Sequence, residues 1–311
     1  MREYPDKNFY KLFIITINFD AVESLEKCIF LLQKILTTIS FDLCVIDNNS
    51  PQRDIESLPQ RFPNVKFHFL KENLGFARAN NYAATLSNSD YLLFLNPDTL
   101  LIEDCISPII DFIEHNPKAG ACGPMLLNQD MTYQNSTGSK MGLLYEIAEA
   151  FLIMPVLRCI QKRKYLKLQM TKQPLNQAWI SGAFMTLKRS VFVEAGGFDP
   201  DYFLNYEDID LCKKIEDKSY NNYYFPYLKC MHLDHRSFID NYELLVLSRY
   251  ESRLIYANKN YSFIMRLAVR VIHIIGLIIR ILFVSFIYSG NERRQRYIGY
   301  IKSLKLYSKI F

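Results

Sequence analysis

Strand-like segments alternate with a helical segment and polar turns through the N-terminal part of the sequence, and this alternation constrains the fold more than any other feature. The segments Leu12 to Ile17, Leu43 to Ile46, Val65 to Leu70 and Tyr91 to Leu95 have the length and the β-branched or aromatic content of strands. Val22 to Ile39 repeats apolar residues every three or four positions, which predicts an amphipathic helix. This order predicts an α/β fold in which right-handed crossovers bring the strand ends to one edge of the sheet.

The segment Tyr91 to Leu95 runs directly into Asn96, Pro97 and Asp98. Because Pro97 disfavours continuation of the strand through the acid, Asp98 is expected just beyond the strand end. Ligands of open α/β sheets bind beyond the carboxyl ends of the strands, which makes Asp98 a candidate binding or catalytic residue. A turn aspartate that caps a helix is the alternative for Asp98 taken alone.

The later part of the sequence predicts further elements. Helices are expected at about 106–114 and 189–195, strands at 120–127, 179–187 and 220–228, and a loop at 128–140. Between the last two strands, Asn205 is predicted to cap a helix whose first turn carries Glu207, Asp208 and Asp210. Helix capping explains one or two of these carboxylates, and three so close together indicate a functional role as well.

Composition sets broad limits on the class of protein. The chain of 311 residues is 50% hydrophobic, which is enough for a substantial core, and a main domain with an appendage fits this length. Its formal charge of +5 comes from Lys and Arg that crowd into the later half, which indicates an anionic neighbour. The cysteines are scattered without a C-x-x-C pair, as in a reduced cytosolic protein. The apolar segment Leu12 to Ile17 is too short for a signal peptide, so no secretion signal is expected.

Two later segments are strongly apolar. Residues 141–168 combine an apolar part with a basic run, and either pack on the sheet as a helical insertion or face a membrane or an acceptor. Within 262–288 the longest uncharged run, Val271 to Ile279, is only about half of the ~18 to 20 residues that a membrane span needs. The polar residues of this helix fall in one narrow sector, namely Arg266, Arg270, His273, Arg280 and Asn291.

This pattern predicts an amphipathic helix that lies in the plane of the membrane and carries a basic stripe that anionic lipid attracts. The helix could instead bind a partner protein or the core of the chain itself. A nucleic acid fits less well, because the phosphate-pairing groups form only a narrow stripe on a helix of mostly Ile and Leu. We therefore expect a cytoplasmic protein that is peripheral on the inner face of the cell membrane.

Seven sequence blocks, in this order, resemble the family 2 glycosyltransferases, and they look closest to the rhamnosyltransferase-like bacterial branch. The blocks are Ile14-Ile15-Thr16-Ile17-Asn18, Val45-Ile46-Asp47-Asn48-Asn49-Ser50, Asn73-Leu74-Gly75-Phe76-Ala77-Arg78-Ala79-Asn80-Asn81, Leu95-Asn96-Pro97-Asp98, Ser181-Gly182-Ala183-Phe184, Gly196-Gly197-Phe198-Asp199 and Glu207-Asp208-Ile209-Asp210-Leu211. The resemblance implies the GT-A fold, a Rossmann-like mixed sheet flanked by helices. It places a catalytic domain at 1–240, which leaves a helical membrane-association region at 241–311.

The resemblance also implies a nucleotide-sugar donor whose leaving diphosphate is neutralised by a divalent cation, Mg or Mn. Asn96 and Asp98 match the Asp-x-Asp motif of the family. Asn96 departs from that motif, and because an amide is a weaker ligand than a carboxylate, Asp98 would provide most of the coordination. A late histidine joins the metal in related enzymes, and His232 matches that position better than His235.

Further donor-binding residues are implied at the ends of the first two strands. Asp47 matches the acid that accepts a hydrogen bond from the pyrimidine ring N–H. Thr16, Asn18 and Asp20 are expected to line the same end of the sheet. Together these four residues would hold the nucleotide of the donor.

The block from Asn73 to Asn81 is also implied to bind the donor. Gly75 permits close approach of the backbone, and Arg78 and the Asn80-Asn81 pair can reach donor phosphate or sugar. The family often has Gly at or beside position 78. Arg78 is therefore either an added phosphate ligand or a solvated side chain.

Transfer with inversion needs a base that removes the proton of the acceptor hydroxyl as this group attacks the anomeric carbon. By resemblance that base is Asp208, and Glu207 orients it, holds acceptor hydroxyls or raises its pKa by like-charge repulsion. We therefore expect an inverting, metal-dependent enzyme that moves rhamnose or another hexose from a dTDP- or UDP-sugar to a lipid-linked glycan in bacterial cell-surface polysaccharide synthesis. The sequence does not predict an oligomeric state.

Two other functions fit parts of the sequence. A non-catalytic member that binds a nucleotide or a glycan would explain Asn96, although Asp98 and Asp208 are both present. A nucleotidyltransferase has a similar fold, but it is expected to carry a glycine- and basic-rich phosphate loop near its N-terminus. The first strand of this chain ends in Asn18-Phe19-Asp20 instead.

Overall fold

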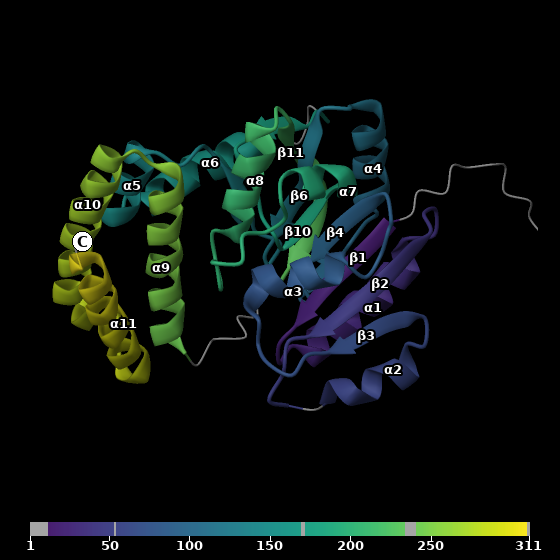
Figure 1. Ribbon diagram of the computed structural model, residues 1–311, viewed down its shortest axis with the longest axis horizontal. Coiled ribbons are helices and arrows are strands. Elements are labelled where there is room, and N and C mark those ends of the chain that lie inside the picture. Colours follow the sequence, from purple (N-terminus) through teal and green to yellow (C-terminus); the bar gives the residue numbers. More distant parts are fainter. Residues whose placement is uncertain (1–11, 53, 169–171, 234–240, 310–311) are drawn as a thin grey trace, which may run out of the picture.

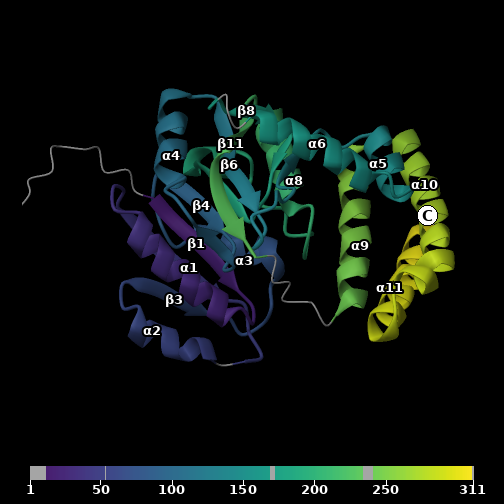
Figure 2. The same cartoon turned by 180° about the vertical axis from the view of Figure 1, so that it is seen from behind.

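The structure is a computed structural model that describes residues 12–52, 54–168, 172–233 and 241–309 (Figure 1). A mixed sheet with helices on both faces forms the larger part of the molecule. A layer of helices lies at one end of this sheet. In this layer the C-terminal helices pack against a helix from the middle of the chain. Seen from behind, the same layer remains on one side of the sheet (Figure 2).

The main sheet has the strand order β3-β2-β1-β4-β10-β6-β11-β5, and β8 pairs with a further part of β11. The bounds of all strands are β1 Leu12–Asn18, β2 Phe41–Asp47, β3 Val65–Phe69, β4 Tyr91–Leu95, β5 Thr99–Leu101, β6 Ala119–Leu127, β7 Thr137–Gly138, β8 Leu175–Gln177, β9 Trp179–Ile180, β10 Phe184–Lys188 and β11 Asn221–His232. Strands β1 to β4 are parallel, and β10 runs antiparallel between β4 and β6. The parallel part places the ends of β1, β2 and β4 on one edge, as the sequence predicts.

Helices cover both faces of this sheet. Their bounds are α1 Val22–Ile35, η1 Asp54–Ser57, α2 Leu58–Arg61, α3 Gly75–Ala84, α4 Ile106–His115, α5 Leu143–Ala150, α6 Met154–Leu168, α7 Arg189–Glu194, α8 Glu207–Asp217, α9 Tyr242–Asn260, α10 Phe263–Ile287 and α11 Gly290–Ser308. Successive side chains of β1 point to opposite faces of the sheet. Ile14 packs in a cluster with Leu25 of α1, and Ile15 packs in a cluster with Ala77 of α3. The sheet is therefore flanked by helices on both faces, as the resemblance implies. The seven cysteines form no disulfide, and Cys159 alone is exposed.

Two strands differ from the sequence prediction. The predicted strand at 179–187 is broken into β9 and β10, because a turn in which the Phe184 amide donates to the Ser181 carbonyl interrupts it. Strand β11 runs on to His232, four residues beyond the predicted end, because its last residues pair with β5. The short β5 was not predicted, since three residues are too few to show a period.

The prediction that Asn205 caps α8 is wrong. The N-cap residue is Tyr206, no side chain caps the helix, and both Asn205 and Tyr206 have left-handed backbone conformations, with φ of 69° and 71°. Non-glycine residues in this region cost about 1–3 kcal/mol each, and they persist only where surrounding contacts hold them. The turn before Glu207 is therefore strained and needs support from elsewhere in the molecule.

The helical layer consists of α9, α10 and α11, with α5 against α10. Its own core includes Val246 and Tyr250 of α9, Leu277 of α10 and Tyr307 of α11. Gly276 allows α5 to approach α10 closely, because a Cβ atom at this position would lie 2.7 Å from the Ala150 carbonyl oxygen. Residues 141–168 therefore pack, through α5, on the C-terminal helices.

Much of the predicted basic stripe of α10 faces the protein. His273 is fully buried, and its Nε2 lies 2.8 Å from the Glu146 carboxylate of α5. Arg280 donates to the carbonyls of Glu149 and Ala150 at the C-terminal end of α5, where a positive charge is favourable. His273 and Arg280 therefore bind the protein itself, which was one of the alternatives for this helix. Periodicity indicated which residues share a face but not the direction of that face.

Candidate functional site

A cleft with a volume of about 450 Å³ lies where the carboxyl ends of β1 and β4 meet the helical layer. Residues from the sheet edge form one wall, and residues of α5 and α9 contribute to the opposite side. Predicted site residues in the lining are Asn73, Gly75, Asn96, Asp98, Glu207, Asp208 and His232. The cleft therefore joins the predicted metal residues to the predicted catalytic carboxylates.

Asp98 and His232 come together because β5 pairs antiparallel with β11. This register sets His232 opposite Thr99, and the Leu233 amide donates to the Asp98 carbonyl. The Nε2 atom of His232 lies 3.2 Å from Oδ1 of Asp98 and 3.2 Å from Nδ2 of Asn96. Asp98 is only 5% exposed, so its carboxylate is held beside the cleft with little access to bulk water.

A second contact orients the His232 ring. Its Nδ1 lies 2.7 Å from Oε1 of Gln134, an acceptor, which places the proton on Nδ1. In the neutral ring, Nε2 then presents its lone pair beside Asp98, the form that binds metals. Within the described residues, no group of three or more His, Cys, Asp or Glu forms a metal cluster. The candidate protein donors for a cation here are Asp98 and His232, and Asn96 would join them through its amide oxygen if its side-chain amide rotated, since Nδ2 now faces His232.

Glu207 and Asp208 begin α8 and turn toward the cleft. Asp208 accepts hydrogen bonds from the backbone amides of Gly182, at 2.9 Å, and Ile209, at 2.8 Å. Gly182 lies in the turn that separates β9 from β10, so the break in the predicted strand is what supplies this donor. Glu207 is 7% exposed, and its Oε2 has no hydrogen-bond partner in the described part of the chain.

The surroundings of the two acids change their basicity. Burial, and after it the negative charge of Asp208, raise the pKa of Glu207. Burial also raises the pKa of Asp208, against the opposing effect of the Gly182 and Ile209 amides. A carboxylate with a raised pKa accepts a proton more readily than an ordinary aspartate, which suits a general base.

The loop from Asn73 to Gly75 is tied to the end of β2. Asn48 donates to Oδ1 of Asn73 and accepts from the Leu74 amide, both at 2.8 Å. Gly75 has a φ of 74°, and a Cβ atom there would lie 2.7 Å from the Phe203 carbonyl oxygen. Only glycine fits this position without displacing the backbone, and the loop is thereby fixed at the edge of the cleft.

Ile17, Phe19 and Asn48 at the first two strand ends line the cleft, but the predicted nucleotide-binding residues beside them do not. Asp47 accepts from Nδ2 of Asn18, from the Ser50 hydroxyl and from the Ser50 amide, and it is 1% exposed. Thr16 is fully buried, and Asp20 accepts from the Gln52 amide. Asn18, Asp47 and Asp20 thus belong to a network through Ser50 and Gln52, whereas the Thr16 hydroxyl has no hydrogen-bond partner among the described residues.

Two residues of the Asn73 to Asn81 block also lie outside the lining. Nε of Arg78 donates to the Pro200 carbonyl at 2.9 Å, and this side chain borders a smaller neighbouring pocket. Asn80 is 1% exposed and donates to the carbonyl of Phe76 within α3. His235, the weaker candidate for the metal histidine, lies outside the described residues.

Several lining residues were not predicted. Tyr145 and Glu149 come from α5, and Leu245, Arg249 and Arg253 are spaced one turn apart on α9. No local motif marks them, because they enter the site only through the packing of the helical layer against the sheet. Trp179, the single tryptophan of the chain, also lines the cleft.

Arg253 connects the helical layer to the strained turn before the catalytic pair. Its Nε donates to the hydroxyl of Tyr206 at 2.7 Å, and the side chain is 2% exposed. Glu146 and Glu149 neutralise its charge at 3.4 and 3.5 Å. Burial alone would raise the pKa of Glu146, but the hydrogen bond from His273 and the charge of Arg253 hold it below its ordinary value. The charged pair of Arg253 and Glu146 thus anchors Tyr206.

We expect Tyr206→Phe to lower kcat by about tenfold while the KM for donor changes less than twofold. The variant removes the hydroxyl that Arg253 binds, and a hydrogen bond to a charged group contributes about 1.5–3 kcal/mol. A loss of about 1.4 kcal/mol in holding the two carboxylates corresponds to that tenfold change. Tyr202→Phe is the matched control, because Tyr202 donates to Asp210 further along α8. Equal effects of the two variants on kcat would contradict a positioning role for Tyr206.

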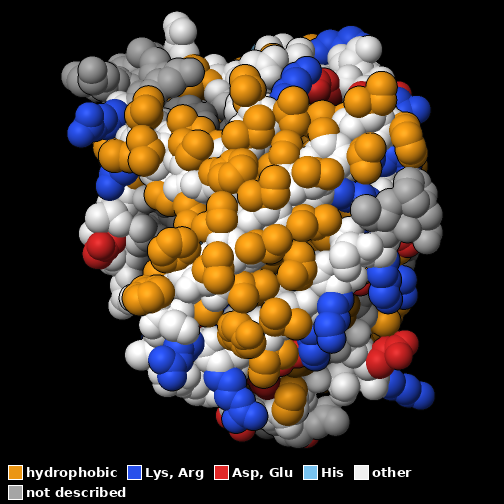
Figure 3. All heavy atoms as spheres, turned by 90° about the vertical axis from the view of Figure 1, so that its left-hand side faces the viewer, with side chains coloured by type: hydrophobic (Ala, Val, Ile, Leu, Met, Phe, Trp, Pro, Cys, Tyr) orange, Lys and Arg blue, Asp and Glu red, His pale blue; other side chains and the backbone are white. Residues whose placement is uncertain are grey.

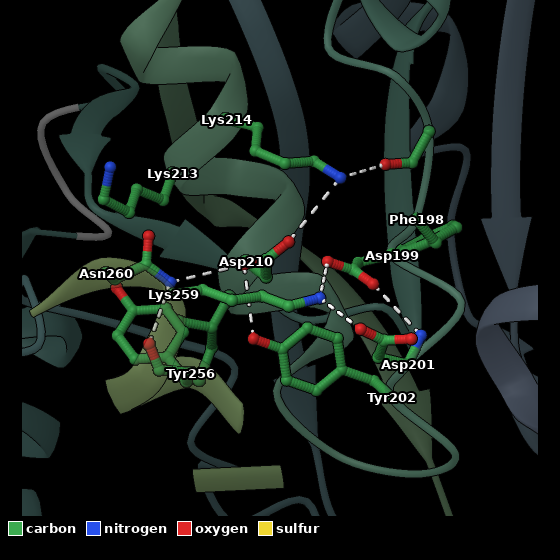
Figure 4. Close-up of polar contacts among 12 residues, drawn as sticks. Phe198, Asp199, Asp201, Tyr202, Asp210, Lys213, Lys214, Tyr256, Lys259 and Asn260 are labelled. Atoms are coloured by element: carbon green, nitrogen blue, oxygen red, sulfur yellow. Dashed lines mark hydrogen bonds and ion pairs between the residues drawn. The ribbon is translucent and has the colours of Figure 1, made fainter. Parts of the chain in front are cut away.

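Asp210 belongs to a structural network on the far side of α8 (Figure 4). It accepts from the Tyr202 hydroxyl at 3.3 Å and from Asn260 of α9 at 3.4 Å. Nearby, Lys259 of α9 binds Asp199 at 2.5 Å and Asp201 at 2.7 Å. These contacts hold α9 against the sheet part of the molecule. Asp210 therefore does more than complete the first turn of its helix.

Comparisons with known proteins agree with this geometry. A family model described as glycosyl transferase family 2 matches residues 13–196. An N-acetylglucosaminyl-diphospho-decaprenol L-rhamnosyltransferase of Mycobacterium tuberculosis (strain H37Rv) is 27% identical over 199 residues, which cover 60% of this chain and 64% of that protein. The rhamnosyltransferase WbbL of Escherichia coli K12 is 28% identical over 202 residues, which cover 60% and 74%. The match thus spans less than two thirds of the mycobacterial protein.

Solved structures of glycosyltransferases share the fold. GalNAc-T7 with UDP, GalNAc and Mn²⁺ superposes with a TM-score of 0.57 at 14% identity, over 86% of this chain and 55% of that one. A mannosyltransferase of Pyrobaculum calidifontis in complex with GDP-Man and Mn²⁺ gives a TM-score of 0.56 at 13% identity, over 95% and 86%. The expected GT-A fold, with helices following it, is confirmed. Because the family model covers more than half of the sequence, the chain belongs to glycosyl transferase family 2.

Proposed function

We propose that this chain transfers a hexose, with inversion, from a nucleotide-sugar donor to a lipid-linked glycan acceptor in bacterial cell-surface polysaccharide synthesis. The observation that carries the proposal is the single cleft that holds both Asp98 with His232 and the pair Glu207 and Asp208. The names of the two rhamnosyltransferases favour dTDP-rhamnose as donor, with a UDP-hexose as the second choice. A diphospholipid acceptor is suggested by the name of the mycobacterial relative.

The donor would lie along the sheet edge. Its diphosphate would reach the Asn73 to Gly75 loop, where the backbone approaches closely, and the Asp98 side of the cleft. Asp47, Asn18 and Asp20, just behind this edge, would hold the nucleotide by exchanging their present hydrogen bonds for bonds to it, and Thr16 would offer its unpaired hydroxyl. Arg78 would act from the neighbouring pocket that it borders, and buried Asn80 would act indirectly, by holding α3 in place.

The acceptor would enter from the side of α8. Asp208 takes the proton of the acceptor hydroxyl. The oxygen of that hydroxyl attacks the anomeric carbon from the face opposite the diphosphate. The new glycosidic C–O bond forms while the bond between the anomeric carbon and the diphosphate oxygen breaks, and the nucleoside diphosphate leaves with the electron pair. Burial and the charge of Asp208 raise the pKa of Glu207, so that Glu207 takes up a proton more readily than an ordinary glutamate, and a shared proton would limit the repulsion between the two acids.

A divalent cation fits the donor side. Asp98 would offer a carboxylate, His232 its Nε2 nitrogen and Asn96, after rotation of its side-chain amide, an oxygen, and this set suits Mn more than the oxygen-preferring Mg. When bound, such an ion would neutralise charge on the leaving diphosphate. The two solved relatives contain Mn²⁺, which supports this choice.

A panel of nucleotide sugars tests the donor. We expect dTDP-rhamnose, with Mn²⁺ present, to raise the melting temperature more than UDP-, GDP- or CMP-sugars. A ligand that binds only the folded state stabilises the protein, and the ligand that binds most tightly stabilises it most. The best binder is then incubated with a polyprenyl-diphosphate-linked sugar and analysed for a glycosylated product. Binding without any transfer would favour the non-catalytic alternative, and preference for another donor would overturn the choice of rhamnose.

A broad apolar face supports membrane association. Figure 3 shows hydrophobic side chains covering the outer side of the helical layer, with Lys and Arg at the margin. On α10 the exposed large hydrophobic residues are Phe263, Ile264, Leu267, Val271, Ile275, Ile278, Leu282, Phe283, Phe286 and Ile287. In the described residues, α10 is also the one helix long and apolar enough to span a membrane by length and composition. Its buried His273 and its contacts with α5 favour a helix that lies on the surface.

We propose that this face rests on the inner leaflet, with 1–240 as catalytic domain and 241–311 as membrane-association region. Ile264→Ser with Phe286→Ser should reduce sedimentation with phosphatidylglycerol vesicles by at least tenfold. These side chains are 79% and 84% exposed, and burying each in lipid would contribute about 1.5–3 kcal/mol. The matched control is Phe30→Ser with Val193→Ser, which are 56% and 65% exposed on α1 and α7.

Unchanged binding of the α10 double variant would remove this face as the membrane contact. Point variants are preferable to deleting 262–311. The deletion would take away His273 and leave buried Glu146 and Arg253 without part of their network, so the remaining chain would lose stability for an unrelated reason. Circular dichroism confirms that both double variants remain folded.

A further inference from the structure

Two arginines of α9 line the cleft, and within the described residues carboxylates neutralise the charge of Arg253 but not that of Arg249. Leu245, Arg249 and Arg253 succeed one another by one turn along α9, and all three line the cleft. Arg253 is buried and neutralised by Glu146 and Glu149. Arg249 is exposed, and it forms no ion pair or hydrogen bond with any residue that the structure describes. Its guanidinium is therefore available to an anionic ligand in the cleft.

The position of Arg249 relates it to the acceptor side. It belongs to the helical layer, whereas Asp98 and the Asn73 to Gly75 loop belong to the sheet edge (Figure 1). Helix α5 connects the cleft to the apolar exterior, because Tyr145 and Glu149 line the cleft while Leu144 is 83% exposed. A helix is about 10–12 Å across, so a lipid held at that exterior has its head group within one helix width of the cleft.

We propose that Arg249 binds the diphosphate of the lipid-linked acceptor and so selects acceptors that carry this group. The inference rests on the proposed function. A planar guanidinium binds phosphate oxygens through two parallel hydrogen bonds, and an unpaired one loses no ion pair when it does so. The donor diphosphate lies on the other wall, so two diphosphates occupy the cleft without sharing ligands.

Transfer kinetics of the full chain with saturating donor tests the proposal. Arg249→Ala should raise the KM for a polyprenyl-diphosphate-linked sugar by about 10- to 100-fold, since bonds between charged groups are lost. The KM for an alkyl glycoside of the same sugar, which has no phosphate, should change less than twofold, as should the KM for donor. Arg249→Lys should restore part of the loss. Arg294→Ala, at an exposed position of α11, is the matched control for loss of one positive charge.

A binding measurement keeps the proposal testable without turnover. Trp179 is the single tryptophan and lines the cleft, so its fluorescence reports occupancy. Farnesyl diphosphate should quench it at lower concentration than farnesol, and Arg249→Ala should abolish the difference. If the wild-type chain binds farnesyl diphosphate in this way but transfers no sugar, the proposed function fails while this inference stands.

Three results would overturn the inference. A KM for the alkyl glycoside that rises as much as that for the diphosphate acceptor would make Arg249 a sugar contact. A rise in the KM for donor would assign Arg249 to the donor diphosphate instead. Equal quenching by farnesyl diphosphate in wild type and Arg249→Ala would show that other groups bind the phosphate.

Discussion

Replacing Asp208 with Asn is expected to lower kcat by about 10²- to 10⁴-fold, which is the usual contribution of a general base. Asn cannot accept the proton of the acceptor hydroxyl, yet it keeps one oxygen for the hydrogen bond from Gly182. The change also removes a buried charge beside Glu207, so the melting temperature should not fall. The KM for donor should stay within about twofold, because Asp208 acts on the acceptor side.

Steady-state transfer and the melting temperature of Asp208→Asn are measured together. The control is Asp217→Asn, at the last residue of the same helix, where the carboxylate pairs with Lys213 on the surface. That variant should transfer sugar at the wild-type rate. If Asp208→Asn retained more than a tenth of the wild-type kcat, another group would be the base, and Glu207 would be the first candidate.

The sequence predicted the elements that carry the site better than the contacts that assemble it. Apolar strand runs identified β1 to β4, and the acids that follow β4 and begin α8 do line one cleft. Parallel strands joined by helices leave few arrangements, so strand ends meet at one edge. His232 reaches Asp98 through the three-residue β5, whose antiparallel pairing no periodicity could show.

The helical layer was the least predictable part. Its helices were found from their period, but the period does not determine which neighbour each face contacts. Arg280 and His273 bind α5, and Arg253 binds Tyr206, over separations of 130, 127 and 47 residues. Tertiary contacts of the same kind hold the turn before α8, where Arg253 binds the Tyr206 hydroxyl and Ser252 donates to the Leu204 carbonyl, and local capping preferences do not include them.

Replacing Asp98 with Asn is the second change with a large expected effect. In Asp98→Asn, we expect kcat to fall by at least about 10²- to 10³-fold at any Mn²⁺ concentration. Metal stabilisation of a leaving group supplies several kcal/mol, and each 1.4 kcal/mol is a factor of ten. The half-saturating Mn²⁺ concentration should rise as well, since His232 and two amides would replace the only carboxylate of the set. Asp111→Asn, an exposed change on α4, controls for loss of charge.

The neighbouring Asn96 allows a change in the opposite direction. The amide nitrogen of Asn96 lies 3.2 Å from Nε2 of His232, and Asn96→Asp places a second carboxylate oxygen there. This variant should lower the half-saturating Mn²⁺ concentration about tenfold. Titration of transfer activity with Mn²⁺, and equilibrium binding of Mn²⁺ in the presence of nucleoside diphosphate, measure both variants. If Asp98→Asn and Asn96→Asp leave the Mn²⁺ dependence unchanged, the cation binds elsewhere, and Asp98 orients His232 without coordinating metal.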